Sequence, residues 1–149
     1  MIKTCNFGLN IKPSVMKNLK QIVLIGVLLV FGISITSFGQ KAKPWVVPEN
    51  FKTMSNPVKS DDASILAGKE IFNKNCISCH GKTGIGDGPK SKGLKTPVAS
   101  FLTADCQKQT DGELFYKSKT GRGDMPKYEG KIDDTGLWQT VNYIRSLKK

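Results

Sequence analysis

The first helix of this chain can be recognised from apolar positions three and four residues apart. Ile65, Gly68 and Phe72 follow this spacing, which gathers side chains on one face of a helix. The Ser-Asp-Asp stretch 60–62 comes directly before them and supplies an N-cap and negative charge for the first turn. Because glycine destabilises a helix interior, Gly68 is expected to permit close approach of another helix. The predicted helix runs into Cys76.

A second helix with the same spacing is predicted at the C-terminal end. Its apolar stripe consists of Leu137, Val141 and Ile144, flanked by Trp138 and Tyr143. Asp133 and Asp134 place negative charge at its start, and the lysines 148–149 place positive charge at its end. Negative charge at the start and positive charge at the end of a helix both interact favourably with the helix dipole.

A shorter helix lies between these two. Thr110 and Glu113 have the spacing of a capping box, and Gly121 closes the segment after about three turns. The stretches 81–89 and 90–101 are predicted loops, with core-facing residues Leu94, Val98 and Phe101 in the second of them. Strand-like alternation of any length is absent from the sequence, so the predicted class is all-α.

The N-terminal region follows a different pattern. Residues 22–38 form an uncharged apolar run after Lys17 and Lys20, and Ser-Phe-Gly at 37–39 resembles a cleavage site ahead of Gln40. Residues 1–39 are therefore predicted to be a signal peptide, with Met16 as a possible true start. The alternative is an uncleaved anchor helix, since the run is near the lower length limit for spanning a bilayer.

The segment 40–59 has proline spacing and no helical period, which predicts an extended arm that packs Trp45 or Phe51 on the domain. A disordered linker is the alternative. Residues 60–149 then suffice for one domain. The formal net charge of the 149 residues is +11, but the lysines are scattered, so nucleic-acid binding is not expected.

The stretch Cys76–His80 reads C-x-x-C-H, the attachment signature of c-type haem. Two thiols at this spacing can each form a thioether with a haem vinyl group, and His80 can then serve as the proximal axial ligand of the iron. Half a zinc site is an alternative, but a structural zinc site needs four protein ligands. A thioredoxin-like pair would need a preceding strand, whereas a helical pattern precedes Cys76. An export signal supports the haem assignment, because haem is attached to such motifs outside the cytoplasmic membrane.

The sixth iron ligand is predicted to be a methionine. His80 is the only histidine of the chain, which excludes bis-histidine ligation within one chain, and methionine is the other common partner. Met54 and Met125 remain beyond the signal. Met125 is preferred over Met54 and over an open site, because it lies in a loop between two helices and Pro126 holds it out of helical conformation.

From the first helix onward the chain resembles a class I monohaem cytochrome c. The matching residues are Gly68, Phe72, the C-x-x-C-H stretch 76–80, Gly88-Pro89, the Gly-Asp-Met-Pro stretch 123–126, Trp138 and the stretch 141–145. It looks most like small bacterial periplasmic carriers related to the cytochrome subunit of cbb3-type oxidases. The resemblance implies a fold of short helices and long loops around one covalent haem c, with the first and last helices crossing near Gly68 and Tyr143. It also implies that the Pro89 carbonyl accepts a hydrogen bond from His80 Nδ1.

These features together predict a periplasmic, monomeric electron carrier rather than an enzyme. Its expected partners are redox proteins with acidic docking surfaces, met by lysines such as Lys82, Lys90, Lys92 and Lys127. A membrane is expected only through an uncleaved signal or a membrane oxidase. The alternatives are a haem subunit of a larger respiratory complex and a sensor or peroxidase in which Met125 is displaced.

Cys106, an odd cysteine, is predicted to be a buried small residue, with a dimerising thiol as the alternative.

Overall fold

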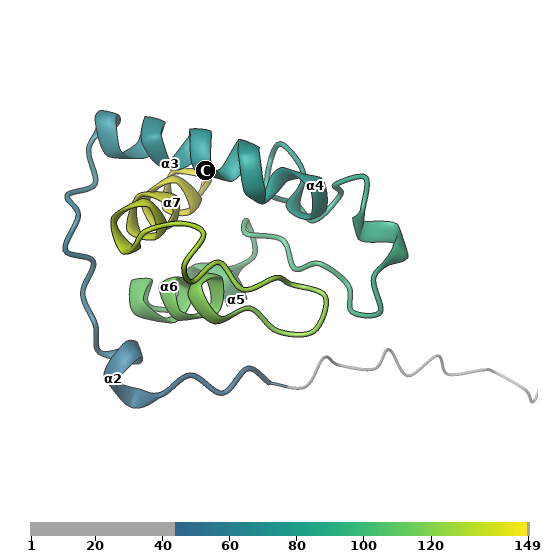
Figure 1. Cartoon of the computed structure of the whole chain (residues 1–149), viewed down its shortest axis with the longest axis horizontal. Coiled ribbons are helices and arrows are strands. Elements are labelled where there is room, and N and C mark those ends of the chain that lie inside the picture. The colour runs from purple at the N-terminus through teal and green to yellow at the C-terminus, as the bar shows by residue number, and fades with distance from the viewer. Residues whose placement is uncertain (1–43, 149) are drawn as a thin grey trace, which may run out of the picture. The chain divides into compact units, whose positions relative to one another are not determined.

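The computed structural model describes residues 44–148, and this part of the chain is helical (Figure 1). The helices are α2 (Glu49–Lys52), α3 (Asp62–Asn75), α4 (Ile77–His80), α5 (Ala104–Gln107), α6 (Asp111–Thr120) and α7 (Asp134–Ser146), with a 3-10 turn η1 (Ser91–Gly93). Within this part of the chain, β-type pairing is confined to one bridge between Arg122 and Met125. The predicted all-α class is confirmed. The predicted signal peptide, residues 1–39 with Met16, lies outside the described residues.

Helices α3 and α7 cross, as Figure 1 shows for the teal and yellow helices, and Gly68 lies at the crossing. A Cβ atom on Gly68 would lie 1.9 Å from the carbonyl oxygen of Gln139, so the two backbones are in direct contact and no side chain fits between them. Beyond this point the rings of Phe72 and Tyr143 meet edge to face, with centroids 5.2 Å apart. The predicted close approach at Gly68 is confirmed.

The three long helices begin where their capping residues predict. The Asp61 side chain accepts a hydrogen bond from the Ser64 amide at the start of α3. Thr110 and Glu113 form both bonds of the capping box at the start of α6. Asp133 accepts from the amide of Gly136 and begins α7. Each cap satisfies amides that the first helical turn leaves without partners.

The core lies between α6 and α7. Its buried residues are Cys106, Leu114, Phe115, Leu137, Trp138, Val141 and Ile144. Phe115 and Trp138 stack face to face with ring centroids 4.0 Å apart. Burial of these side chains removes apolar surface from water and holds α6 on α7. Cys106 is a member of this cluster, which confirms its prediction as a buried small residue.

The described part of the arm, residues 44–59, packs against this core and is not extended throughout. Pro48 precedes the short helix α2, in which Lys52 pairs with Glu49. Phe51 lies 4.8 Å from the ring of Tyr116 on α6. The prediction of a wholly extended segment is therefore wrong for residues 49–52, because a proline at the N-cap and paired end charges favour one helical turn there. Over residues 44–148, no helix has the length and apolar character needed to cross a bilayer.

Candidate haem-binding site

The C-x-x-C-H stretch forms a single helical turn at the end of α3. Cys76 ends α3 and begins α4, and the amide of His80 donates to the Cys76 carbonyl at 2.9 Å. Residues three and four apart in a helix share a face, so Cys76, Cys79 and His80 emerge on one side of α4. Both thiols are free and half-buried. The sequence motif is thus brought together as the attachment chemistry requires.

His80 presents an imidazole that fits an iron ligand. Its ring stacks on Phe101 with centroids 4.4 Å apart, and the Nδ1 atom is buried without a hydrogen-bond partner. Burial lowers the pKa of His80 to about 4, against a smaller opposing effect of the Ala99 carbonyl. The ring is therefore neutral near pH 7, the form in which imidazole binds a metal.

The predicted hydrogen bond between His80 Nδ1 and the Pro89 carbonyl is not formed in this structure. The loop around Pro89 does lie against α4, because the amides of Gly88 and Lys90 donate to the carbonyls of Cys79 and Ser78 at 3.1 and 2.9 Å. The imidazole, however, is stacked on the Phe101 ring, and its Nδ1 has no partner. In this structure Pro89 is therefore a neighbour of the motif along the backbone, and its hydrogen bond to the ring stays a prediction for the haem-bound protein.

The thiols and a tyrosine share one buried environment. Burial raises the pKa of Cys76 to about 12, with a further contribution from Cys79. The pKa of Tyr128 is also raised to about 12, first by burial and then by the charges that Cys76 and Cys79 would carry. The Cys76 thiol and the Tyr128 hydroxyl therefore stay protonated near pH 7. Among residues 44–148 no three His, Cys, Asp or Glu side chains gather as a metal site would need, so the zinc alternative lacks ligands there.

Met125 lies in a tight loop, residues 121–130, called here the Met125 loop. The amides of Arg122 and Met125 each donate to the carbonyl of the other residue, at 2.9 and 3.0 Å. Gly121 begins the loop with a φ of +62°, and a Cβ atom there would lie 2.5 Å from the backbone of Pro126. The two limbs of the loop therefore touch at their base. This closure fixes the backbone from which the Met125 side chain extends.

The Met125 loop is joined to the helix that carries the motif. The Tyr128 hydroxyl donates to the carbonyl of Asn75 at 2.6 Å, one residue before Cys76. Asp124 accepts from the Lys95 amide at 2.9 Å. The first bond holds the loop to the end of α3, and the second holds it to the segment that follows η1. Tyr128 is a residue that the sequence analysis missed, although a tyrosine three positions after the ligand candidate was visible.

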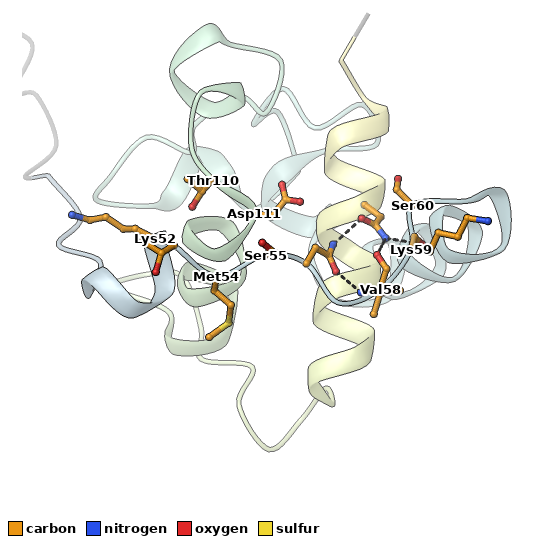
Figure 2. A pocket seen from close by; sticks show the side chains of 11 residues that line it. Lys52, Met54, Ser55, Val58, Lys59, Ser60, Thr110 and Asp111 are labelled. Carbon is orange, nitrogen blue, oxygen red and sulfur yellow. Dashed lines mark hydrogen bonds between the residues drawn. The ribbon is translucent and has the colours of Figure 1, made fainter.

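Met54 lies elsewhere. It follows α2, which Figure 1 places at the opposite end of the view from α4. Met54 lines a groove of about 550 Å³ between the arm, the start of α6 and Asn142 of α7; Figure 2 shows its side chain there. No residue of the C-x-x-C-H stretch lines this groove. The Met54 side chain is 37% exposed. The structure therefore associates Met125 with the motif through Tyr128 and leaves Met54 apart from it.

A helical turn with two free thiols, a neutral buried imidazole and a methionine loop tied to the same helix end fits one chemistry. The two thiols would form the covalent attachment of a haem at Cys76 and Cys79, and His80 would offer its neutral imidazole to the iron. The fold and these residues define a c-type cytochrome domain.

Comparison with known proteins gives the same class. Residues 63–144 match the family model described as cytochrome c oxidase, cbb3-type, subunit III. The chain belongs to this family of cytochromes c. The matched residues span α3 to α7 and contain the C-x-x-C-H stretch and the Met125 loop. They leave out the arm.

The individual relatives include a cytochrome c6 and two proteins described as subunits of respiratory complexes. Cytochrome c6 of Leptolyngbya boryana is 30% identical over 82 residues, which are 55% of this chain and 91% of that protein. The cbb3-type cytochrome c oxidase subunit CcoP of Azospirillum brasilense is 25% identical over 123 residues, 78% of this chain and 41% of that protein. The cytochrome c subunit of the bc1 complex of Corynebacterium diphtheriae is 30% identical over 90 residues, 60% of this chain and 29% of that protein.

Among solved structures, a chain of the reducing HAO-like protein complex Kustc0457/Kustc0458 of Kuenenia stuttgartiensis superposes with a TM-score of 0.56 at 24% identity. The match covers 74% of this chain and 53% of that one, so it supports the fold and nothing more. The family match and the cytochrome relatives, and not this superposition, make the protein a carrier of covalently bound haem c. It acts as an electron carrier or as a subunit of a respiratory complex, and not as an enzyme by itself.

Proposed function

We propose that this protein is a periplasmic electron carrier whose single haem c is attached through Cys76 and Cys79 and ligated by His80 and Met125. The observation that carries the proposal is the closed Met125 loop, joined by Tyr128 to the end of α3 immediately before the motif. A methionine on a backbone fixed in this way can serve as a lasting ligand, whereas a mobile one would exchange with water.

Each residue has a separate role in this proposal. The haem supplies the one-electron couple when bound. Cys76 and Cys79 hold it by thioether bonds, and His80 offers a neutral nitrogen. The thioether of Met125 is a soft donor that favours ferrous iron, so it raises the reduction potential. If His80 and Met125 both bind the iron, oxygen and peroxide would find no free coordination site there, which would favour electron transfer over catalysis.

The test replaces each methionine in turn. Oxidised wild-type protein should be low-spin and show the far-red sulfur-to-iron band, and the reduced protein should bind negligible carbon monoxide. Met125→Ala should lose the band, lower the reduction potential and bind carbon monoxide. Met54→Ala is the matched control and should keep all wild-type properties. Loss of the band in Met54→Ala, or ready carbon monoxide binding by the wild type, would refute the ligand assignment and favour a sensor or peroxidase.

The periplasmic location rests on the predicted signal, residues 1–39. The proposal is that cleavage leaves a mature chain beginning at Gln40. The intact mass of the protein made in a host that attaches haem to such motifs should equal that of residues 40–149 with one haem. A mass that retains residues 22–38, found in the membrane fraction, would indicate an anchor instead.

The proposed partners are redox proteins with acidic surfaces, met by a monomer. Lys82, Lys90 and Lys92 are exposed on the loops that follow the motif. Lys127, also exposed, is paired with Glu129 at 2.7 Å, so it adds less positive potential than the other three. Positive charge at this surface would steer an acidic partner, and reduction by an anionic reagent should slow as salt rises. A rate independent of ionic strength would contradict this part of the proposal.

A second candidate is a haem subunit of a larger respiratory complex. The relatives from Azospirillum brasilense and Corynebacterium diphtheriae, which carry such descriptions, favour it. The two candidates share the haem site and differ in partner. Size-exclusion chromatography of a gentle detergent extract from the native membrane would separate them. A carrier elutes alone, and a subunit elutes with the complex.

A further inference from the structure

The arm before α3 has no role in the proposed function, yet two of its residues contact the Met125 loop. The guanidinium of Arg122 lies over the Trp45 ring, with its carbon 4.5 Å from the ring centroid. Arg122 Nη1 also donates to the Pro44 carbonyl at 3.2 Å. Two consecutive arm residues therefore hold one side chain of the loop. The arm lies outside residues 63–144, which match the family model.

The arm can hold this side chain because the arm itself is fixed. Val47 is 4% exposed, and Phe51 packs on Tyr116 of α6. Further along, the Asn56 side chain donates to the Trp138 carbonyl and to Asn142 Oδ1, at 3.3 and 2.8 Å. These contacts hold the arm first on α6 and then on α7. Trp45 is therefore anchored two residues away by the buried Val47.

Arg122 is also the residue that pairs with Met125. Its amide and carbonyl form both hydrogen bonds of the bridge that closes the loop. A guanidinium stacked on an aromatic face is attracted by the ring quadrupole, so Trp45 restrains the backbone of Arg122. Movement of Arg122 away from the domain would separate it from Trp45 and would open the bridge to Met125.

We infer that Trp45 is a positioning residue for Met125, and that the arm acts through the Trp45–Arg122 stack as a strap that keeps the Met125 loop closed. This inference rests on the proposed function in one respect, that Met125 is an iron ligand. On the same limb as Arg122, Asp124 accepts from the Lys95 amide, and on the far limb the amides of Tyr128 and Glu129 donate to the Lys119 carbonyl. Trp45 holds the near limb.

The experiment compares Trp45→Ala with Val46→Ala in the full-length haem protein. Val46 is the matched control, since it neighbours Trp45 and is 83% exposed. Two quantities are measured: hydrogen exchange of the Arg122 and Met125 amides, and the rate at which imidazole replaces the axial ligand of the oxidised protein. Loss of the stack should raise both by about threefold to tenfold in Trp45→Ala. Exchange of the Val141 amide in α7 should stay unchanged in both variants.

The two readouts separate the inference from the function on which it rests. Exchange at Arg122 and Met125 reports closure of the loop whether or not Met125 binds iron. Wild-type exchange in Trp45→Ala would overturn the strap. Faster exchange with an unchanged imidazole rate would overturn the positioning of the ligand. Failure of the Met125 assignment itself is detected independently by Met125→Ala.

A second variant tests whether the effect passes through Arg122. Arg122→Gln removes the cation and should reproduce the rise in both rates. The double variant Trp45→Ala/Arg122→Gln should then show the same rates as Arg122→Gln alone, because Arg122→Gln already removes the stack on Trp45 together with the bond to Pro44. Additive effects would show that Trp45 acts by another route and would overturn the inference. If Trp45→Ala does not fold, Arg122→Gln and Trp45→Phe decide it: the first should accelerate both rates and the second should retain wild-type values.

Discussion

The crossing of α3 and α7 and the Met125 loop hold their residues by different means. At the crossing the side chains of Phe72, Leu137 and Val141 are fully buried, and the helix backbones touch at Gly68. In the Met125 loop no residue is buried, and the ties are backbone hydrogen bonds and side-chain contacts at the rim. The packing of the crossing therefore depends on the volume of the side chains in it, and the conformation of the Met125 loop depends on hydrogen bonds. One positions His80, and the other positions Met125.

The largest effect is expected at the thiols that lie between the two regions. In the wild type, acid-acetone extraction should leave haem on the polypeptide. Cys76→Ala/Cys79→Ala should release all of it, since no thioether remains. Cys106→Ala is the control, because Cys106 belongs to the α6–α7 core and should keep haem attached. Release of haem from Cys106→Ala, or from the wild type, would contradict the attachment site.

The volume dependence of the crossing is tested at Gly68. Gly68→Val should destabilise the domain by about 3 kcal/mol or more, because the new side chain meets backbone that cannot move aside. Gly93→Ala is the control, since nothing lies within 4 Å of a Cβ atom there. Denaturant unfolding measures both. Equal stability of the two variants would mean that α3 and α7 do not touch at this point.

A polar network within the crossing should contribute less. Asn142 is buried, donates to Ser64 Oγ at 2.7 Å and accepts from Asn56 at 2.8 Å. Asn142→Ala should cost about 1–3 kcal/mol, because the partners stay buried without it. Asn73→Ala, at an exposed position of α3, should leave the free energy of unfolding within about 0.5 kcal/mol of the wild type. An unchanged midpoint for Asn142→Ala would show that water replaces its bonds.

The smallest effect is expected in the Met125 loop. Asp124 is exposed and accepts from the Lys95 amide. Asp124→Ala should lower the free energy of unfolding by less than about 1 kcal/mol, while hydrogen exchange at Lys95 rises several-fold. Asp105→Ala, at another exposed position, should leave that amide unchanged. A large loss of global stability would mean that the loop belongs to the same cooperative unit as the crossing.

The long helices could be predicted because their signals are local. Three helix starts are marked by their N-cap residues, which are Asp61, Thr110 and Asp133. The motif was equally visible, since the C-x-x-C-H spacing needs no tertiary information. Gly68 was correctly predicted as a contact point because a glycine at a helix interior is costly without one.

The short helices and the loop contacts could not be predicted in the same way. Helices α2, α4 and α5 each contain four residues, too few to show a period. The stacking of the His80 ring on Phe101 depends on segments that are separate in sequence. The stack of Trp45 on Arg122 has the same origin. The sequence shows an aromatic residue in a proline-spaced arm, and only the fold brings the two together.

The crossing also affects the order in which contacts form as this chain folds. Its two helices lie near opposite ends of the described residues, so Gly68 has no partner until the segment around Gln139 has been synthesised. Contacts between such distant segments form late, after the loop-closure entropy has been overcome. Until that contact forms, α3 and the motif at its end lack the packing that α7 supplies. Closure of the crossing therefore completes the scaffold from which Cys76 and Cys79 are presented.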